Sequence, residues 1–352
     1  MTLRLIGIGG LGNMLGPSAT YLKDGTVARY LRMYDRGTSG HYRDQCREAW
    51  RNHGTELVTN FSDLIGDGDF DGVVICAGKN GDDYKIIKEL VSLLVQKKNY
   101  FILHFSTVSC AFVRATDAFC SQHEIQYVNY PLTGGAKGAA SAKMLILASG
   151  NKTLYERVLP MLNKIGVPKY FGEDITQAAA VKFIGHVMVF HGLLGISLAA
   201  VLQKNILKLP ALGAEQLEFF DFLNNGAGGT KQWDVTLRQA LQNNNWQEGF
   251  LLKHAAIDVI YTVELMRDNK IPSPLILPIL EIASLFAQLL RQPQGDLLAT
   301  SAVANLIDTI PRQSMEDFLF ETISLDINKC VENCVRALPD SIQETLMLDV
   351  SY

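Results

Sequence analysis

The feature that most constrains this sequence is a set of glycines at the end of a short apolar run near the N-terminus. Residues 3–8 are mostly apolar, as in a buried strand, and Gly7, Gly9 and Gly12 have the spacing G-x-G-x-x-G. In this pattern the glycines permit a tight turn, close approach of a pyrophosphate and packing of the next helix. The N–H groups at the start of that helix then hold the phosphates. The spacing predicts a dinucleotide-binding turn at residues 7–14.

An acidic residue supports this prediction. Asp35 closes a second apolar run, residues 30–34, at roughly the twenty-residue distance from Gly12 that the fingerprint requires for a ribose ligand. An ordinary glycine-rich turn is the alternative, and the strand before and the acid after argue against it. Asp35 favours NAD because its carboxylate repels a 2′-phosphate, whereas the adjacent Arg36 can bind that phosphate. The expected cofactor is NAD or NADP, with NAD favoured.

Composition narrows the class of protein. With 352 residues, 48% hydrophobic and 19% charged, the chain is long enough for two soluble domains. A net charge of −4 gives no field that attracts nucleic acid. The six cysteines form no C-x-x-C pair and no zinc pattern, which predicts reduced thiols, no metal and a cytoplasmic protein. Residues 183–202 resemble a membrane span, but their polar residues favour a buried helix or a dimer interface over a membrane location.

Residues 1–172 alternate between strand-like and helical patterns. This alternation predicts an α/β fold, a Rossmann-type doubly wound parallel sheet. The strand-like runs are residues 3–8, 28–34, 73–77, 100–105, 125–129 and 144–149. Because such sheets bind ligands at the carboxyl ends of their strands, the site loops are expected at residues 9–14, 35–37, 77–81, 106–110 and 131–138.

The pattern changes after residue 172, where strand-like runs stop and helical patterns dominate. The first is a long helix over residues 174–204, with Asp174 or Thr176 as its expected N-cap. We therefore predict a dinucleotide-binding domain at residues 1–172 and an all-helical substrate and dimerisation domain at residues 173–352. Its final segment, residues 311–352, carries no motif with a functional interpretation.

Lys182 lies near the start of the long helix. Hydride transfer to or from a hydroxyl carbon requires a group that exchanges the hydroxyl proton, and a lysine does so when partial burial near a helix N-terminus lowers its pKa. His186 follows one helical turn later on the same face. A solvated lysine and a core histidine are the alternative interpretations from position alone.

Four blocks then occur in an order that a known family shares. They are Ile-Gly-Ile-Gly-Gly-Leu-Gly-Asn-Met at residues 6–14, His-Phe-Ser-Thr at residues 104–107, Tyr-Pro-Leu-Thr-Gly-Gly at residues 130–135, and Lys182. Together they resemble the 3-hydroxyisobutyrate dehydrogenase family, within the β-hydroxyacid dehydrogenases that include 6-phosphogluconate dehydrogenase. A weaker match surrounds Lys253.

The resemblance implies an NAD(P)-dependent oxidoreductase that interconverts a 3-hydroxy acid and its semialdehyde, and a homodimer. It implies Lys182 as general acid/base, with His186 beside it. The substrate carboxylate is expected at Thr133, Gly134 and Gly135, where glycines expose backbone N–H groups; a simple turn is the alternative. The expected cofactor-binding residues are Gly7, Gly9, Gly12, Asn13, Met14, Asp35, Arg36, Ala77, Ser106, Thr107 and Lys253.

The sequence also departs from the family pattern. His186 replaces an asparagine, His254 replaces the aspartate after Lys253, and Asn129 replaces another aspartate. These changes keep hydride chemistry and leave the substrate open. Two alternatives therefore stand: an imine or other carbonyl reductase, against which Lys182 argues, and a non-catalytic dinucleotide-binding sensor.

Overall fold

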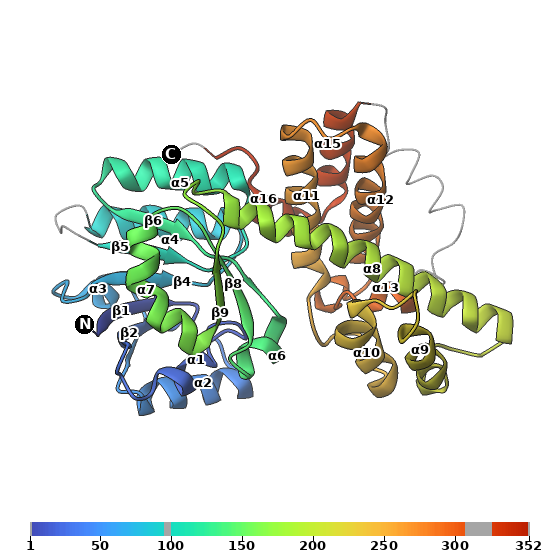
Figure 1. The fold of residues 1–352 in the computed structure, drawn as a ribbon, viewed down its shortest axis with the longest axis horizontal. Coiled ribbons are helices and arrows are strands. Elements are labelled where there is room, and N and C mark those ends of the chain that lie inside the picture. The colour runs from blue at the N-terminus through green and yellow to red at the C-terminus, as the bar shows by residue number, and fades with distance from the viewer. Residues whose placement is uncertain (1, 95–99, 307–325, 351–352) are drawn as a thin grey trace. The chain divides into compact units, whose positions relative to one another are not determined.

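The structure, a computed structural model, describes residues 2–94, 100–306 and 326–350 (Figure 1). The chain divides into two compact units, residues 1–182 with 345–352, and residues 183–344. The first unit extends beyond the predicted boundary at residue 172 because the next helix is bonded to it: the Ala178 N–H donates to Ser149 Oγ at 2.9 Å. Of the predicted C-terminal extension, residues 311–325 lie outside the described residues.

A six-stranded parallel sheet forms the centre of the first unit, in the order β3-β2-β1-β4-β5-β6. This confirms the predicted doubly wound sheet. The strands of the unit are β1 (Leu3–Ile8), β2 (Ala28–Tyr34), β3 (Glu56–Val58), β4 (Gly72–Ile75), β5 (Phe101–His104), β6 (Gln126–Asn129), β7 (Leu132–Thr133), β8 (Met144–Ala148) and β9 (Gly166–Tyr170). Its helices before the long one are α1 (Ser18–Leu22), α2 (His41–Asn52), α3 (Phe61–Ile65), α4 (Asn80–Leu94), α5 (Cys110–Gln122), α6 (Gly135–Ala140) and α7 (Lys152–Ile165).

Helices cover both faces of this sheet: Figure 1 shows α2 on one side and α4 and α5 on the other. Every residue of β4 and β5 is buried, which explains why these strands are apolar up to His104 at the end of β5. From α2, the fully buried Trp50 packs on Tyr30 of β2 and donates through Nε1 to the carbonyl oxygen of Gly10 at 2.7 Å. This bond ties α2 to the glycine turn.

A second, three-stranded sheet was not predicted. In it β8 pairs antiparallel with β7 and parallel with β9. The apolar run at residues 144–149, which we expected in the main sheet, therefore belongs to a separate one. β6 is the strand at one edge of the main sheet, where the Tyr130 N–H still donates to the His104 carbonyl oxygen at 2.7 Å, and the chain leaves this sheet at Pro131.

The second unit is helix-rich, as predicted. The long helix α8 (Gln177–Leu207) begins in the first unit and continues into the second. The remaining described helices are α9 (Leu217–Asn224), α10 (Arg238–Asn243), α11 (Leu252–Asp268), α12 (Ser273–Leu290), α13 (Ala302–Leu306), α15 (Ile327–Ala337) and α16 (Asp340–Leu346), with short 3₁₀ turns η1 (Ala214–Gln216) and η3 (Gly295–Leu297) and a π-helical turn η2 (Trp233–Leu237). Both predicted cap residues lie just before α8: Asp174 Oδ1 accepts hydrogen bonds from the N–H and hydroxyl of Thr176.

Among the residues that the structure describes, two helices, α8 and α12, are long and apolar enough to cross a membrane by length and composition. They differ in burial: 67% of the α12 window is buried, as in a core helix, but only 39% of the α8 window. The exposed apolar side chains of α8 are Ile184, Met188, Leu198, Leu202, Ile206 and Leu207. We call this set the α8 apolar face.

Candidate active site

The glycine turn lies at the carboxyl end of β1. Gly9 has a φ of +87°, and a Cβ at this position would lie 1.9 Å from the carbonyl oxygen of Cys76, just after β4. Only glycine therefore lets the turn pack against the end of β4. The strand order reverses between β1 and β4, which is the crevice where doubly wound sheets bind ligands. The turn fits a dinucleotide phosphate site.

The helix after the turn begins later than the fingerprint predicts. Residues 9–17 form successive turns, in which the Gly12 N–H donates to the carbonyl oxygen three residues earlier at 3.0 Å, and α1 starts only at Ser18. The several glycines of this stretch disfavour an earlier helix. The phosphate donors we expect are therefore N–H groups of the turn itself, which contains the exposed Asn13 and the partly buried Met14.

Asp35 directly follows β2, as predicted, but its carboxylate is already paired. Oδ2 accepts from Arg47 Nε at 2.7 Å, and Oδ1 accepts from Arg47 Nη2 at 2.9 Å and from the Gly37 N–H at 2.8 Å. The Arg47 guanidinium holds the pKa of Asp35 below its usual value. This bidentate pair neutralises the charge on which the preference for NAD depends.

The sequence did not identify Arg47 as part of the site. It lies on α2, twelve positions after Asp35, and only the return of that helix over β2 brings the two together. Arg36, which we expected at the cofactor, is exposed. Burial raises the pKa of Asp82 in α4, and the charge of Arg36 opposes that rise only in part. Asp35 therefore has two arginines nearby: Arg36 is the next residue in the sequence, and Arg47 binds the carboxylate from α2.

The loops after β4 and β5 are bonded to each other. The Ala77 N–H donates to Ser106 Oγ at 3.1 Å, so two predicted cofactor residues lie together at the crevice. Thr107 follows, partly buried. The helix after β5 is capped by Ser109, whose Oγ accepts from the Phe112 N–H at 3.1 Å.

Lys182 lies against the predicted substrate loop. Its Nζ donates to the carbonyl oxygen of Leu132 at 2.8 Å, next to Thr133, and the side chain is buried. Gly134 and Gly135 follow with φ of +128° and +62°, and a Cβ at Gly135 would meet no atom within 4 Å. The positive φ values of these glycines therefore turn the backbone sharply, two and three residues after the carbonyl oxygen that Lys182 contacts. The solvated-lysine alternative is excluded.

His186 is buried in the second unit. Its Nδ1 lies 3.7 Å from Asp258 Oδ2 of α11, and its ring lies among Phe183, Phe190 and Phe250. Sequence analysis missed Asp258, because an isolated acid in an apolar helix gives no pattern. The catalytic role of His186 stays a prediction.

Lys253 and Asn129 are two further residues that the family comparison singled out. Lys253 lies in the first turn of α11, partly buried, so its role at the cofactor also stays a prediction. Asn129 is buried at the end of β6, where Nδ2 donates to the carbonyl oxygens of His104 and Ser106, both at 3.0 Å. Asn129 therefore supports the loop after β5.

Comparison with known proteins agrees with this geometry. Residues 5–179 match the NAD-binding domain of 6-phosphogluconate dehydrogenase. The N-terminal unit belongs to this family. It is an NAD-binding domain, and the match confirms the family resemblance and the nicotinamide cofactor predicted from the sequence.

Individual relatives extend the comparison. A 2-(hydroxymethyl)glutarate dehydrogenase from Eubacterium barkeri is 21% identical over 51% of this chain and 58% of its own length, so the chain spans about half the length of such curated relatives. A solved 3-hydroxyisobutyrate dehydrogenase from Salmonella typhimurium shares the fold with a TM-score of 0.70 and 18% identity, over 86% of this chain and 99% of its own. An imine reductase from Myxococcus stipitatus is less similar, with a TM-score of 0.52 and 16% identity, over 91% and 100%.

Proposed function

We propose that this protein is an NAD(P)-dependent oxidoreductase that interconverts a 3-hydroxy acid and the matching semialdehyde. One observation carries the proposal: the buried Lys182 Nζ lies 2.8 Å from the Leu132 carbonyl, at the start of the glycine loop and within the NAD-binding unit. An amine here can exchange a proton with a substrate held by that loop. The names of the relatives, which are hydroxyacid dehydrogenases, support the same reaction class.

Different residues of the protein bind the substrate and exchange its proton. The N–H groups of Thr133, Gly134 and Gly135 bind the substrate carboxylate, which fixes the hydroxyl carbon beside Lys182. On oxidation Lys182 Nζ accepts the hydroxyl proton, and on reduction it returns that proton to the carbonyl oxygen. The nicotinamide, when bound, supplies or accepts the hydride.

A substrate panel tests the proposal. Hydroxy acids with the hydroxyl on carbon 3 and their semialdehydes are assayed with NAD and NADP and their reduced forms, at the absorbance of the reduced nicotinamide. Turnover of one such pair supports the proposal. A cyclic imine in the same panel tests the reductase alternative, and nicotinamide binding without turnover of any compound favours the sensor.

We further propose that His186 adjusts the proton affinity of Lys182, one helical turn away. A protonated imidazole beside a lysine disfavours the ammonium form, and the Asp258 carboxylate compensates part of that charge. We expect the titration of this imidazole to add a limb to the pH–rate profile. His186→Asn removes this limb. An unchanged profile in that variant would return His186 to a core role.

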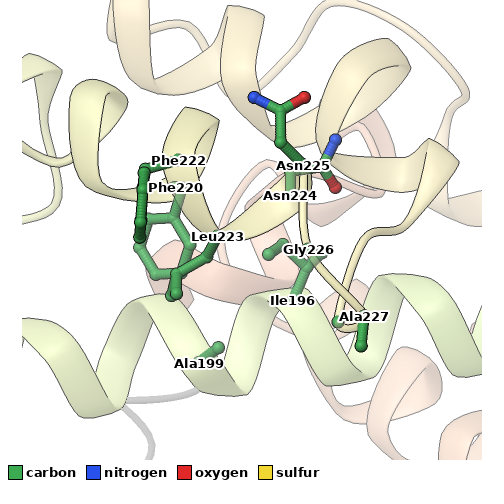
Figure 2. Close-up of a pocket in the computed structure, with 10 residues that line it drawn as sticks. Ile196, Ala199, Phe220, Phe222, Leu223, Asn224, Asn225, Gly226 and Ala227 are labelled. Atoms are coloured by element: carbon green, nitrogen blue, oxygen red, sulfur yellow. The ribbon is translucent and has the colours of Figure 1, made fainter.

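A second copy of this chain is the proposed partner of the α8 apolar face. Large side chains recur on this helix at spacings of about one turn, and the exposed fractions of Met188 and Ile206 are 75% and 71%. A groove of about 530 Å³ lies between α8, at Ile196 and Ala199, and α9, where Figure 2 shows the side chains of Phe222 and Leu223. Phe222 is 77% exposed. Apolar surface of this extent is typical of an interface.

Sedimentation at micromolar concentration tests the dimer. We expect a dimer mass for the unmodified protein, and a monomer mass for the double variant Met188→Glu with Leu202→Glu, because both side chains would bury charge in the interface. Gln247→Glu, at an exposed polar position, is the control and keeps the dimer mass. A monomer in all three samples contradicts the proposal.

The proposed location is the cytoplasm. The six cysteines, all within the described residues, form no disulfide bond, and four of them are buried, which suits a reducing compartment.

A further inference from the structure

A network of buried hydrogen bonds connects the core of the first unit to the loop after β4. In β5, His104 Nε2 lies 2.9 Å from Asp83 Oδ2 of α4, and His104 Nδ1 lies 2.8 Å from the Tyr127 hydroxyl of β6. The other carboxylate oxygen, Asp83 Oδ1, accepts the Gly78 N–H at 3.0 Å. The side chains of His104 and Asp83 are both 0% exposed. Neither residue belongs to the site predicted from the sequence.

The hydrogen-bonding capacity of each group determines which atom donates and which accepts in this network. An ionised Asp83 can only accept, so His104 Nε2 carries the proton between them. The Gly78 N–H is a second donor to the same carboxylate. Burying a carboxylate without such partners is costly, so Asp83 requires both His104 and the Gly78 N–H in place.

The loop that Asp83 holds, residues 76–78, lines the crevice in which the dinucleotide is expected to bind. Gly78 lies two residues after Cys76, whose carbonyl oxygen is the atom that only a glycine at position 9 can approach. A Cβ on Gly78 itself would lie 2.5 Å from the Asp82 side chain, so this loop also has little space to move. The position of residues 76–78 therefore determines the space left beside the glycine turn.

We propose that Asp83 and His104 are positioning residues for coenzyme binding. They hold the Gly78 N–H, and with it the loop after β4, in the orientation that the dinucleotide requires before it binds. Because the loop is set in advance, binding costs less ordering of the backbone. The inference rests on the NAD-binding domain and needs no catalytic turnover.

A second set of bonds supports the far side of the same loop. Asn80 Nδ2 donates to Ser109 Oγ at 2.9 Å and to the Met347 carbonyl oxygen at 2.9 Å, while Asn80 Oδ1 accepts the Ser109 N–H at 2.9 Å. These bonds fix the start of α4 to the loop after β5. The bond from Asp83 is the one that reaches the N–H group of Gly78.

Three variants of the chain test this role by titration with NADH and with NAD. Asp83→Ala removes the bonds to Gly78 and His104, and we expect the Kd for both nicotinamides to rise about 10-fold or more. Asp83→Asn keeps the shape and an oxygen acceptor for the Gly78 N–H, and we expect a Kd within about 3-fold of the unmodified protein. Tyr127→Phe is the matched control, because it removes the hydrogen bond between Tyr127 and His104 from the same buried network and leaves the bonds of Asp83 in place.

The control separates positioning from stability. Tyr127→Phe is expected to lower the melting temperature like the other variants and to leave the Kd within about 3-fold. Amide exchange adds a direct readout: Gly78 exchanges faster in Asp83→Ala than in Tyr127→Phe. If Asp83→Ala does not fold, Asp83→Ser replaces it, since serine fills more of the space without reaching both partners. Unchanged NADH binding in the folded variant, or equal weakening in Tyr127→Phe, overturns the proposal.

Discussion

Lys182→Met is expected to lower turnover of the 3-hydroxy acid or semialdehyde by ~10²–10⁴-fold, the usual contribution of a general acid/base. Methionine keeps an apolar stem of similar length but cannot exchange a proton. Coenzyme affinity should stay within about 3-fold, because Lys182 bonds to the Leu132 carbonyl and not to the glycine turn. Rates under saturating substrate, with coenzyme titrations on the same samples, measure both quantities.

The loss of one hydrogen bond also affects stability. Leaving a buried carbonyl without its donor costs about 1–3 kcal/mol, which lowers the melting temperature by several degrees at most. Lys143→Met is the matched control, since it removes an exposed lysine from the same unit near the same loop. Full turnover in Lys182→Met would show that another group, or water, carries the proton.

Sequence patterns predicted the sheet well where burial alone determines structure. The bounds of β1 and β2 match the predicted runs, residues 3–8 and 28–34, because a short, mostly apolar run suits a largely buried parallel strand. The same pattern at residues 144–149 gave a strand in a different sheet, since periodicity does not specify the partner. The short β3 and β7 offered too few residues for any pattern.

Some residues of the candidate site could likewise be predicted from the sequence, and others could not. The glycine turn was predicted because its glycines stand at a fixed spacing, whereas the roles of the loop around Gly134 and of Lys182 came from the family resemblance. Arg47 and the Asp83–His104 pair were not, because their partners are distant in the sequence and each alone resembles an ordinary surface or core residue. Such pairs depend on how helices return over strands, which local patterns do not contain.

Coenzyme choice should depend on Arg47. We expect Arg47→Met to weaken NADP binding by ~10–100-fold, about 1.4–2.8 kcal/mol, while NAD binding changes by less than about 3-fold. In the unmodified protein the guanidinium neutralises Asp35 through two bonds. Without Arg47 the carboxylate stays ionised at neutral pH, because an ordinary aspartate pKa is about 3.9. Its uncompensated charge then repels a 2′-phosphate, whereas a ribose hydroxyl can donate to the freed oxygens.

Dissociation constants for NAD and NADP, measured on the unmodified protein and its variants, test this. The sequence predicts a preference for NAD, which the Asp35–Arg47 pair reduces in the unmodified protein and which Arg47→Met increases; tighter NADP binding by the unmodified protein would show that Arg36 and Arg47 outweigh that carboxylate. Arg43→Met is the control, because it removes the same charge from α2 but leaves the Asp35–Arg47 pair intact. Equal weakening of both coenzymes in Arg47→Met would mean that Arg47 acts only by holding the loop after β2, and coenzyme choice would then depend on Arg36 and Asp35 alone.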